Sequence, residues 1–241
     1  MGVALVRLLM VDLAPLLSIL NTLPRTGDCL LVARDVSLSK LAGDASNRSY
    51  YRVRWKEGAR AQSLILMVLA DPEPFKASEE AVSGTASPIT ELPFINIQRH
   101  LAACGVAVPA MVYYHQEKGW LLLEDVGDHL FAQEVMRHFH DTKRVISLYQ
   151  NAIDILVQMQ HRAPPTPALR PLSHDRAFDQ ALFVWEFDHF IEYGIEKRDG
   201  APLPEKEKEA IRACFSEIAF QLAMLPRVFT HRDYHSRNLM I

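Results

Sequence analysis

The stretch THRDYHSRNLMI, residues 230–241, carries the clearest indication of what this sequence encodes. Within it, His231, Arg232 and Asp233 are followed by Asn238, five residues after the aspartate. This spacing is typical of a catalytic loop for in-line phosphoryl transfer. Asp233 would orient the attacking hydroxyl, Arg232 would fix the loop, and the amide oxygen of Asn238 would bind Mg²⁺. The apolar runs VFTH and NLMI predict two short strands that flank the loop.

The same residues allow a second interpretation. His231, Asp233 and His235 alternate, so on a strand all three side chains would face one side and could bind one metal ion. A hydrolytic metal site would need further His or carboxylate ligands in similar clusters, and the other histidines are scattered. Phosphoryl transfer is therefore the favoured interpretation, and a metal hydrolase is the alternative.

The composition limits the class of protein. The 241 residues are 49% hydrophobic and 23% charged, which suits a soluble chain of one large domain or two modest ones. The net charge of −3 gives no general attraction to nucleic acids or anionic membranes, so neither is an expected partner. The 3 cysteines show no C-x-x-C spacing and predict neither a disulfide framework nor a zinc site. With no convincing signal peptide, we expect a cytoplasmic protein.

The first half of the chain changes its pattern once. Residues 1–35 predict an amphipathic helical segment with leucines on one face. Residues 36–124 then predict a small antiparallel sheet, because RSYYRVRW alternates, SLILMVLA is a continuous apolar run, and MVYYH and WLLLE follow. One helix interrupts these strands between Pro93 and Gly105. The leucines of the first segment are Leu8, Leu9, Leu13, Leu16, Leu17 and Leu20.

The second half, residues 125–241, has mainly helical periodicity. Apolar residues at three- and four-residue steps predict helices from Asp141 to the Pro164-Pro165 pair, over 175–193 and over 204–225. We therefore expect an α+β fold of two lobes: a nucleotide-binding sheet lobe over 36–124 and a partial helical lobe that contains the loop.

Two further segments have the chemistry of a nucleotide site. LAGDASNRSYYRV, residues 41–53, places a turn of small residues before a strand, and its free N–H groups could cover phosphates. LLLEDVGD, residues 121–128, ends an apolar strand with backbone polar groups that could pair with an adenine edge. Each is weak alone, because ordinary turns have the same composition.

Taken together and in this order, these segments resemble the aminoglycoside phosphotransferase family. The resemblance extends over residues 38–241 and is strongest to the bacterial anomeric kinases of N-acetylmuramate and N-acetylglucosamine, which share LAGDAS, LLLED and HRDYHSRNLM patterns. It implies a protein-kinase-like fold, ATP and Mg²⁺ as cofactors, and transfer of the γ-phosphoryl to a sugar hydroxyl in cell-wall recycling.

The resemblance also assigns roles to residues. It makes Asp233 the catalytic base and Asn238 a metal ligand, while Glu124 and Val126 belong to the adenine hinge. Where protein kinases have a strand lysine, this chain has Met67, so Arg48 or Arg52 would supply the cation. The phosphate loop would consist of Gly43, Asp44, Ala45 and Ser46.

The family continues past the asparagine with a D-F-Q-D segment whose first Asp binds metal. The sequence has no residue after Ile241, so we expect impaired activity from the chain as written. An inactive nucleotide-binding pseudokinase or interaction fragment is the alternative, and aminoglycoside, choline or homoserine remain alternative acceptors. Trp185 and Glu186 are the weaker candidates for contacts to an amino sugar. The sequence predicts no particular oligomeric state.

Overall fold

The computed structural model describes residues 11–24, 30–41, 48–57, 59–69, 91–162, 172–175 and 177–241. The chain divides into two compact units, Met1–Pro72 with Pro109–Gly127 and Glu73–Val108 with Asp128–Ile241. The helix after Pro93 groups with the second unit, and the expected division into residues 1–35, 36–124 and 125–241 stays a prediction. The expected phosphate loop, Gly43 to Ser46, lies outside the described residues.

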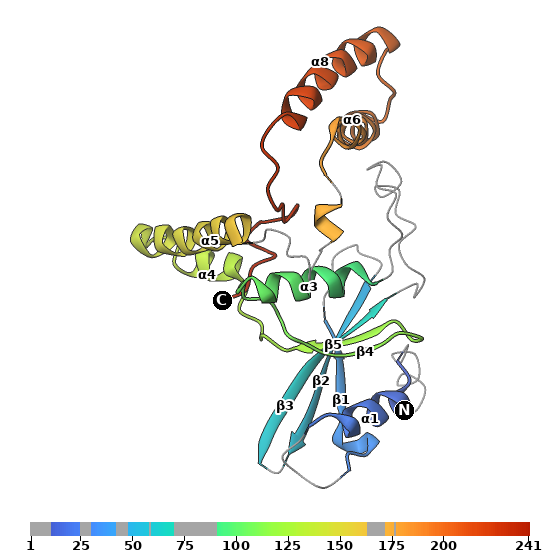
Figure 1. Ribbon diagram of the computed structural model, residues 1–241, viewed down its shortest axis with the longest axis vertical. Helices are drawn as coiled ribbons and strands as arrows, with labels where there is room; N and C mark the ends of the chain where they lie inside the picture. The colour runs from blue at the N-terminus through green and yellow to red at the C-terminus, as the bar shows by residue number, and fades with distance from the viewer. Residues whose placement is uncertain are drawn as a thin grey trace. The chain divides into compact units, whose positions relative to one another are not determined.

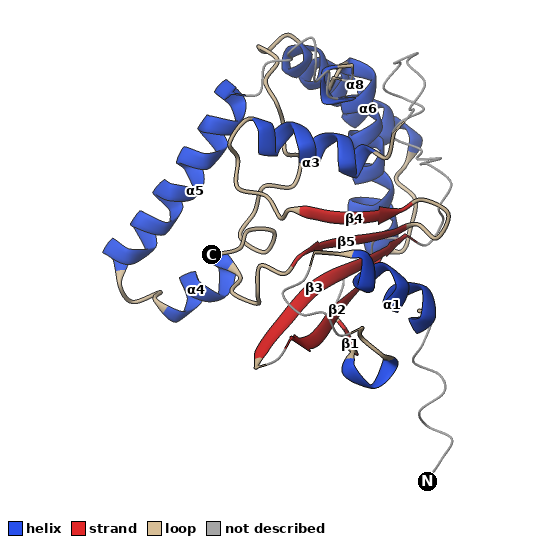
Figure 2. Ribbon diagram, turned by 60° about the horizontal axis from the view of Figure 1, so that its bottom comes forward, coloured by secondary structure: helices blue, strands red, loops and turns tan. Residues whose placement is uncertain are grey.

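The first unit contains one antiparallel sheet. Its five strands, labelled in Figure 1, have the order β1-β2-β3-β5-β4, which can be followed in Figure 2. The four strands expected from RSYYRVRW, SLILMVLA, MVYYH and WLLLE are confirmed as β2, β3, β4 and β5. The bounds are β1 Ser37–Lys40, β2 Arg48–Glu57, β3 Arg60–Leu69, β4 Met111–His115 and β5 Trp120–Glu124.

The core of this unit lies between the sheet and helix α1, Leu13–Thr22 (Figure 2). Helix α1 begins where the carboxylate of Asp12 accepts a hydrogen bond from the N–H of Ala14. Its apolar face buries leucines against alternate residues of β2, such as Val53 and Trp55. The alternating residues from which β2 was predicted are therefore those whose side chains point alternately into this core and away from it. A short 3₁₀ turn, Ala33–Asp35, precedes β1.

The second unit is helical. Helix α3 fills the place predicted after Pro93, and α5 begins after Asp141, whose side chain accepts from the N–H of Arg144. Helix α6 begins later than predicted because Asp179 caps it, and it continues into a π-helical segment, Phe190–Glu196. Helix α4 was not predicted. The bounds are α3 Pro93–Ala103, α4 Phe131–Arg137, α5 Thr142–Arg162, 3₁₀ turn Leu172–His174, α6 Gln180–His189, α7 Lys197–Asp199 and α8 Glu205–Ala223.

The two short strands predicted around the HRD loop are wrong. Residues 226–241 form turns and one isolated bridge, from Met240 to Leu130. The backbone there binds to helix α4 instead: the N–H of Phe131 donates to the carbonyl of Leu239, and that of Ala132 to Ser236, both at 2.9 Å. The loop thus satisfies N–H groups of the first turn of α4 that have no partner within the helix.

No helix in the described ranges is both long enough and apolar enough to cross a membrane.

Candidate active site

The carboxylate of Asp233 is held by two side chains of its own loop. Nδ2 of Asn238 donates to Asp233 Oδ2 at 2.6 Å and to the Asp233 carbonyl at 3.0 Å. Nε2 of His235 lies 3.0 Å from Asp233 Oδ1. The Asp233 side chain is nevertheless 68% exposed, so a substrate hydroxyl could reach it. The loop therefore presents one oriented carboxylate, as a general base requires.

The tautomer of His235 follows from its second contact. Nδ1 of His235 accepts a hydrogen bond from the N–H of Arg237 at 3.2 Å, so this nitrogen has no proton. The proton of a neutral imidazole is then on Nε2, which donates to Asp233. The sequence suggests His235 only as a metal ligand, and no sequence pattern distinguishes that role from support of the aspartate.

The loop is anchored through its aromatic residues. Tyr234 donates its hydroxyl to the carbonyl of Ala152 in α5 at 2.5 Å. The ring of His231 meets that of Tyr234 edge to face, with centroids 5.3 Å apart. Burial lowers the pKa of His231; the charge of Asp233 opposes this shift and His235 adds to it. His231 is therefore kept neutral and packs as an aromatic residue.

Arg232 has a strained backbone, with φ of 73°, and is the one non-glycine residue in the described ranges with positive φ. For such a residue the left-handed region costs about 1–2 kcal/mol. Its guanidinium lies over the ring of Phe178 at 5.3 Å and 3.9 Å from the carboxylate of Glu186. These contacts direct the Arg232 side chain toward helix α6 while Asp233 faces solvent.

The two expected substrate residues have different surroundings. Glu186 approaches the loop through Arg232, as described above. Trp185 instead packs against His189, with ring centroids 3.9 Å apart, and its carbonyl is 3.1 Å from His189 Nδ1. Among the described residues, Glu186 therefore contacts the HRD loop through Arg232, whereas the Trp185 ring packs within α6 against His189.

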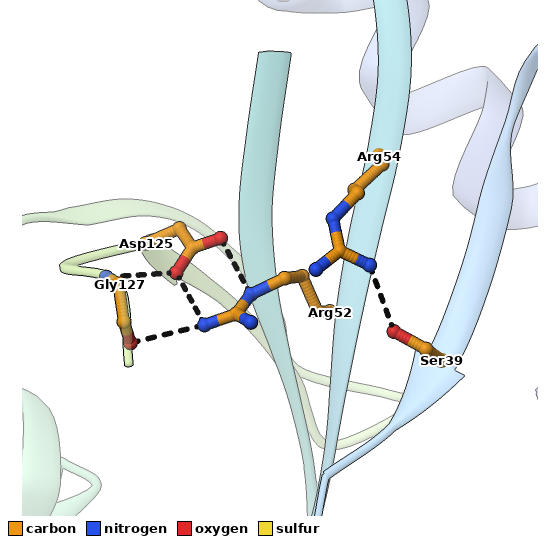
Figure 3. Close-up of polar contacts among 5 residues, drawn as sticks. All are labelled: Ser39, Arg52, Arg54, Asp125 and Gly127. Carbon is orange, nitrogen blue, oxygen red and sulfur yellow. Dashed lines mark hydrogen bonds and ion pairs between the residues drawn. The ribbon is translucent and has the colours of Figure 1, made fainter. Parts of the chain in front are cut away.

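In the first unit, the segment after β5 is fixed by a buried ion pair. Arg52 of β2 binds the carboxylate of Asp125, with Nε 2.7 Å from Oδ2, and also donates to the Gly127 carbonyl at 3.0 Å (Figure 3). Both side chains are only 6% exposed. Burial would raise the pKa of Asp125, but hydrogen bonds from Ser63, Arg52 and the Gly127 N–H, with the charge of Arg52, lower it on balance.

Further residues considered for the nucleotide site lie in strands β2, β3 and β5. Arg48 begins β2 and pairs in register with Leu69, while Met67 is fully buried in β3. The N–H of Glu124 donates to the carbonyl of Ala110, and the Glu124 carboxylate accepts a hydrogen bond from the N–H of Ala110. Asp125 lies in the segment Glu124 to Val126 that the resemblance assigns to the adenine hinge, but its pairing with Arg52 is not predicted by the sequence.

The geometry gives the metal-hydrolase alternative no support. In the part of the chain that the structure describes, no three His, Cys, Asp or Glu side chains come together as ligands for one metal ion. His235 points to Asp233, and His231 Nδ1 is buried, with no hydrogen-bond partner in these ranges.

Sequence comparisons agree with the phosphotransferase interpretation. Residues 37–241 match the profile of the family described as the phosphotransferase enzyme family. An N-acetylmuramate/N-acetylglucosamine kinase of Pseudomonas aeruginosa is 29% identical over 83% of this chain and 50% of its own length. A kinase with the same name from Caulobacter vibrioides is 31% identical over 86% of this chain and 58% of its own length. Another, from Neisseria meningitidis, is 24% identical over 86% of this chain and 54% of its own length.

The chain spans about half the length of these curated relatives. The family match itself extends over most of the chain, from the first strand of the sheet to the HRD loop. An antiparallel sheet followed by helices and this loop is the α+β, protein-kinase-like arrangement that the sequence predicted. The chain belongs to the phosphotransferase enzyme family.

Proposed function

We propose that this protein is an ATP-dependent small-molecule kinase that phosphorylates the anomeric hydroxyl of N-acetylmuramate or N-acetylglucosamine. The observation that carries the proposal is the exposed carboxylate of Asp233, oriented by Asn238 and His235. The names of the relatives support an amino sugar as the acceptor. Because ATP and the recycled sugar would meet inside the cell, the proposal includes a cytoplasmic location.

In this proposal Asp233 accepts the proton of the sugar hydroxyl as the phosphoryl group is transferred. Asn238 turns its amide nitrogen toward Asp233, so its side-chain oxygen is the atom offered to Mg²⁺. Carboxylate and amide oxygens are the ligands that Mg²⁺ prefers, and the residues present fit that ion. When bound, Mg²⁺ supplies positive charge that neutralises the transferring phosphoryl group.

ATP would be held by the first unit. Glu124 and Val126 are proposed to pair with the adenine edge, and Gly43 to Ser46 to cover the phosphates. Arg48 or Arg52 is proposed to supply the cation for the phosphates, and the guanidinium of Arg52 is also bound by Asp125. Glu186, which approaches Arg232, is proposed to lie near the acceptor sugar, with Trp185 as the weaker candidate.

The test is phosphorylation of N-acetylmuramate and N-acetylglucosamine with ATP and Mg²⁺, beside an aminoglycoside, choline and homoserine. We expect phosphate transfer to the amino sugars alone, at the anomeric position, and loss of transfer in Asp233→Asn. A thermal-shift titration with ATP and Mg²⁺ distinguishes a nucleotide-binding pseudokinase from an active kinase, because the pseudokinase would be stabilised by ATP without transferring phosphate. The expectation of impaired turnover for these 241 residues is tested by the same assay.

Transfer to another acceptor in place of the amino sugars would overturn the substrate assignment. Undiminished transfer by Asp233→Asn would overturn the proposed base.

A further inference from the structure

The contacts of Arg52 reach across the sheet. In the register, Arg52 of β2 lies opposite Ile65 of β3, and Ile65 lies opposite Leu123 of β5. Strand β3 therefore separates Arg52 from the strand that leads to Asp125. The guanidinium crosses it and binds Asp125 through two nitrogens, Nε at 2.7 Å from Oδ2 and Nη2 at 3.0 Å from Oδ1.

This position is unusual for an arginine in a sheet. Arg54, two residues further along the strand, is exposed and donates to the hydroxyl of Ser39 at 3.2 Å (Figure 3). Arg52 is 5% exposed as a residue, and a charge so deeply buried is tolerated only when it is paired and hydrogen-bonded. The alternation of β2 cannot account for the burial of Arg52, because a polar residue on the non-core face would ordinarily stay in water.

The pair fixes a short turn rather than the sheet itself. Asp125 Oδ1 also accepts from the N–H of Gly127 at 3.1 Å, and Arg52 Nη2 binds the Gly127 carbonyl at 3.0 Å. Gly127 has φ of 89°, a conformation that a residue with a side chain adopts at a cost. Arg52 thus holds the residues on both sides of Val126.

Val126 is the residue whose backbone this turn presents. No hydrogen bond among the described residues uses the Val126 N–H, and its side chain is exposed. A backbone N–H without a hydrogen-bond partner at this point can donate to an acceptor nitrogen on the edge of a purine base. Its direction depends on residues 125 and 127, which Arg52 binds on either side.

We propose that Arg52, acting through Asp125 and Gly127, is a positioning residue that sets the orientation of the Val126 N–H for recognition of the adenine base. Arg52 does not contact the nucleotide in this role. The inference rests on the proposed function, because it assumes that the segment after β5 meets adenine. It differs from a phosphate-binding role for Arg52, which would act on the other end of the same nucleotide.

The experiment compares binding of ATP with binding of inorganic tripolyphosphate, both with Mg²⁺, by calorimetry. We expect Arg52→Gln to weaken ATP binding about tenfold, the value of about one hydrogen bond, and to leave tripolyphosphate binding within about twofold. Arg52→Lys keeps the charge but not the two-nitrogen contact, and we expect an intermediate loss for ATP alone. Arg54→Gln, on the same strand, is the matched control and should change neither ligand.

A second variant guards against misfolding of Arg52→Gln. Asp125→Asn keeps the size of the side chain and one oxygen for the Gly127 N–H, so we expect it to fold and to show the same selective loss of ATP affinity. Equal weakening of both ligands in Arg52→Gln and Asp125→Asn, or no change in either, would overturn the inference alone. An unaltered chain that binds neither ligand would instead contradict the proposed function, and the inference with it.

Discussion

Asn238 and Asp233 are in direct contact, with Nδ2 of the amide 2.6 Å from Oδ2 of the carboxylate. The spacing of five residues that singled them out in the sequence is therefore the spacing that closes the loop. His235 completes the arrangement from the other carboxylate oxygen. In the proposed function the amide donates to the base and keeps an oxygen for a cation, so an asparagine would suit this position better than a second aspartate.

Replacing Asp233 by Asn should remove the general base while leaving the size of the side chain. We expect kcat for sugar phosphorylation to fall by about 10²–10⁴-fold, with little change in the KM for ATP. Steady-state kinetics measure both constants. Asp199→Asn, an exposed carboxylate in α7, is the matched control and should behave as the unaltered protein. A kcat within about threefold of the unaltered protein would contradict the role of Asp233.

His235 should affect the rate through the orientation of Asp233. His235→Leu removes the Nε2 donor, and we expect kcat to fall about 10–100-fold, as for the loss of one hydrogen bond to a charged group. His235→Gln can again offer an N–H at a similar distance from the backbone, and we expect it to recover most of the rate. If His235→Leu and His235→Gln gave the same kcat, His235 would have only a packing role.

The fold of the first unit was largely predictable because burial follows the sequence pattern of each strand: β2 buries alternate apolar residues, while β3 and β5 bury apolar side chains on both faces. Alternation in β2 and the apolar runs of β3 and β5 reflect which side chains are buried, and the sheet forms where they predicted. The partner of Arg52 was not predictable. Asp125 is 73 residues away, and no local periodicity connects two residues that meet across an intervening strand.

In the HRD loop the local structure was not predicted, and the roles assigned to its residues stay predictions. The apolar runs beside the loop are too short for the pattern of a strand to be distinguished from that of a turn or a helix. Phe229 packs with Leu101 and Met159, and Leu239 packs with Phe131 and residues of α5, so these side chains are apolar for reasons of helix packing. The backbone bonds that a strand would have made go to the first turn of α4.

The neutral His231 should make stability depend on pH. Because burial lowers its pKa in the folded state, the unfolded chain binds more protons as pH falls below the ordinary histidine value of about 6.5. The free energy of unfolding should therefore decrease from pH 7.5 toward pH 5. Gln at position 231 does not titrate, so denaturant titrations of His231→Gln should show a flatter profile over that range. Parallel profiles for the two proteins would contradict this prediction.

The Arg52–Asp125 pair should be costly to break from one side. Arg52→Ala leaves a buried carboxylate without its partner, and we expect a loss of about 3–5 kcal/mol in the free energy of unfolding. Arg54→Ala, at the exposed position, should stay within about 0.5 kcal/mol. Replacing both partners, as Arg52→Met with Asp125→Leu, should recover much of the loss, because no buried charge remains. Urea titrations measure all four proteins.

Acid should abolish the stabilisation from the same pair. Hydrogen bonding and the charge of Arg52 outweigh burial and lower the pKa of Asp125 in the folded protein, so its contribution is complete above the ordinary aspartate value of about 3.9. It is lost as pH falls below that value through the lower folded pKa, where the carboxylate gains a proton. The difference in unfolding free energy between the unaltered protein and Asp125→Asn should thus be constant from pH 7 to 5 and shrink below about pH 4. A difference that stayed constant under acid would show that the charge of Asp125 contributes nothing to the fold.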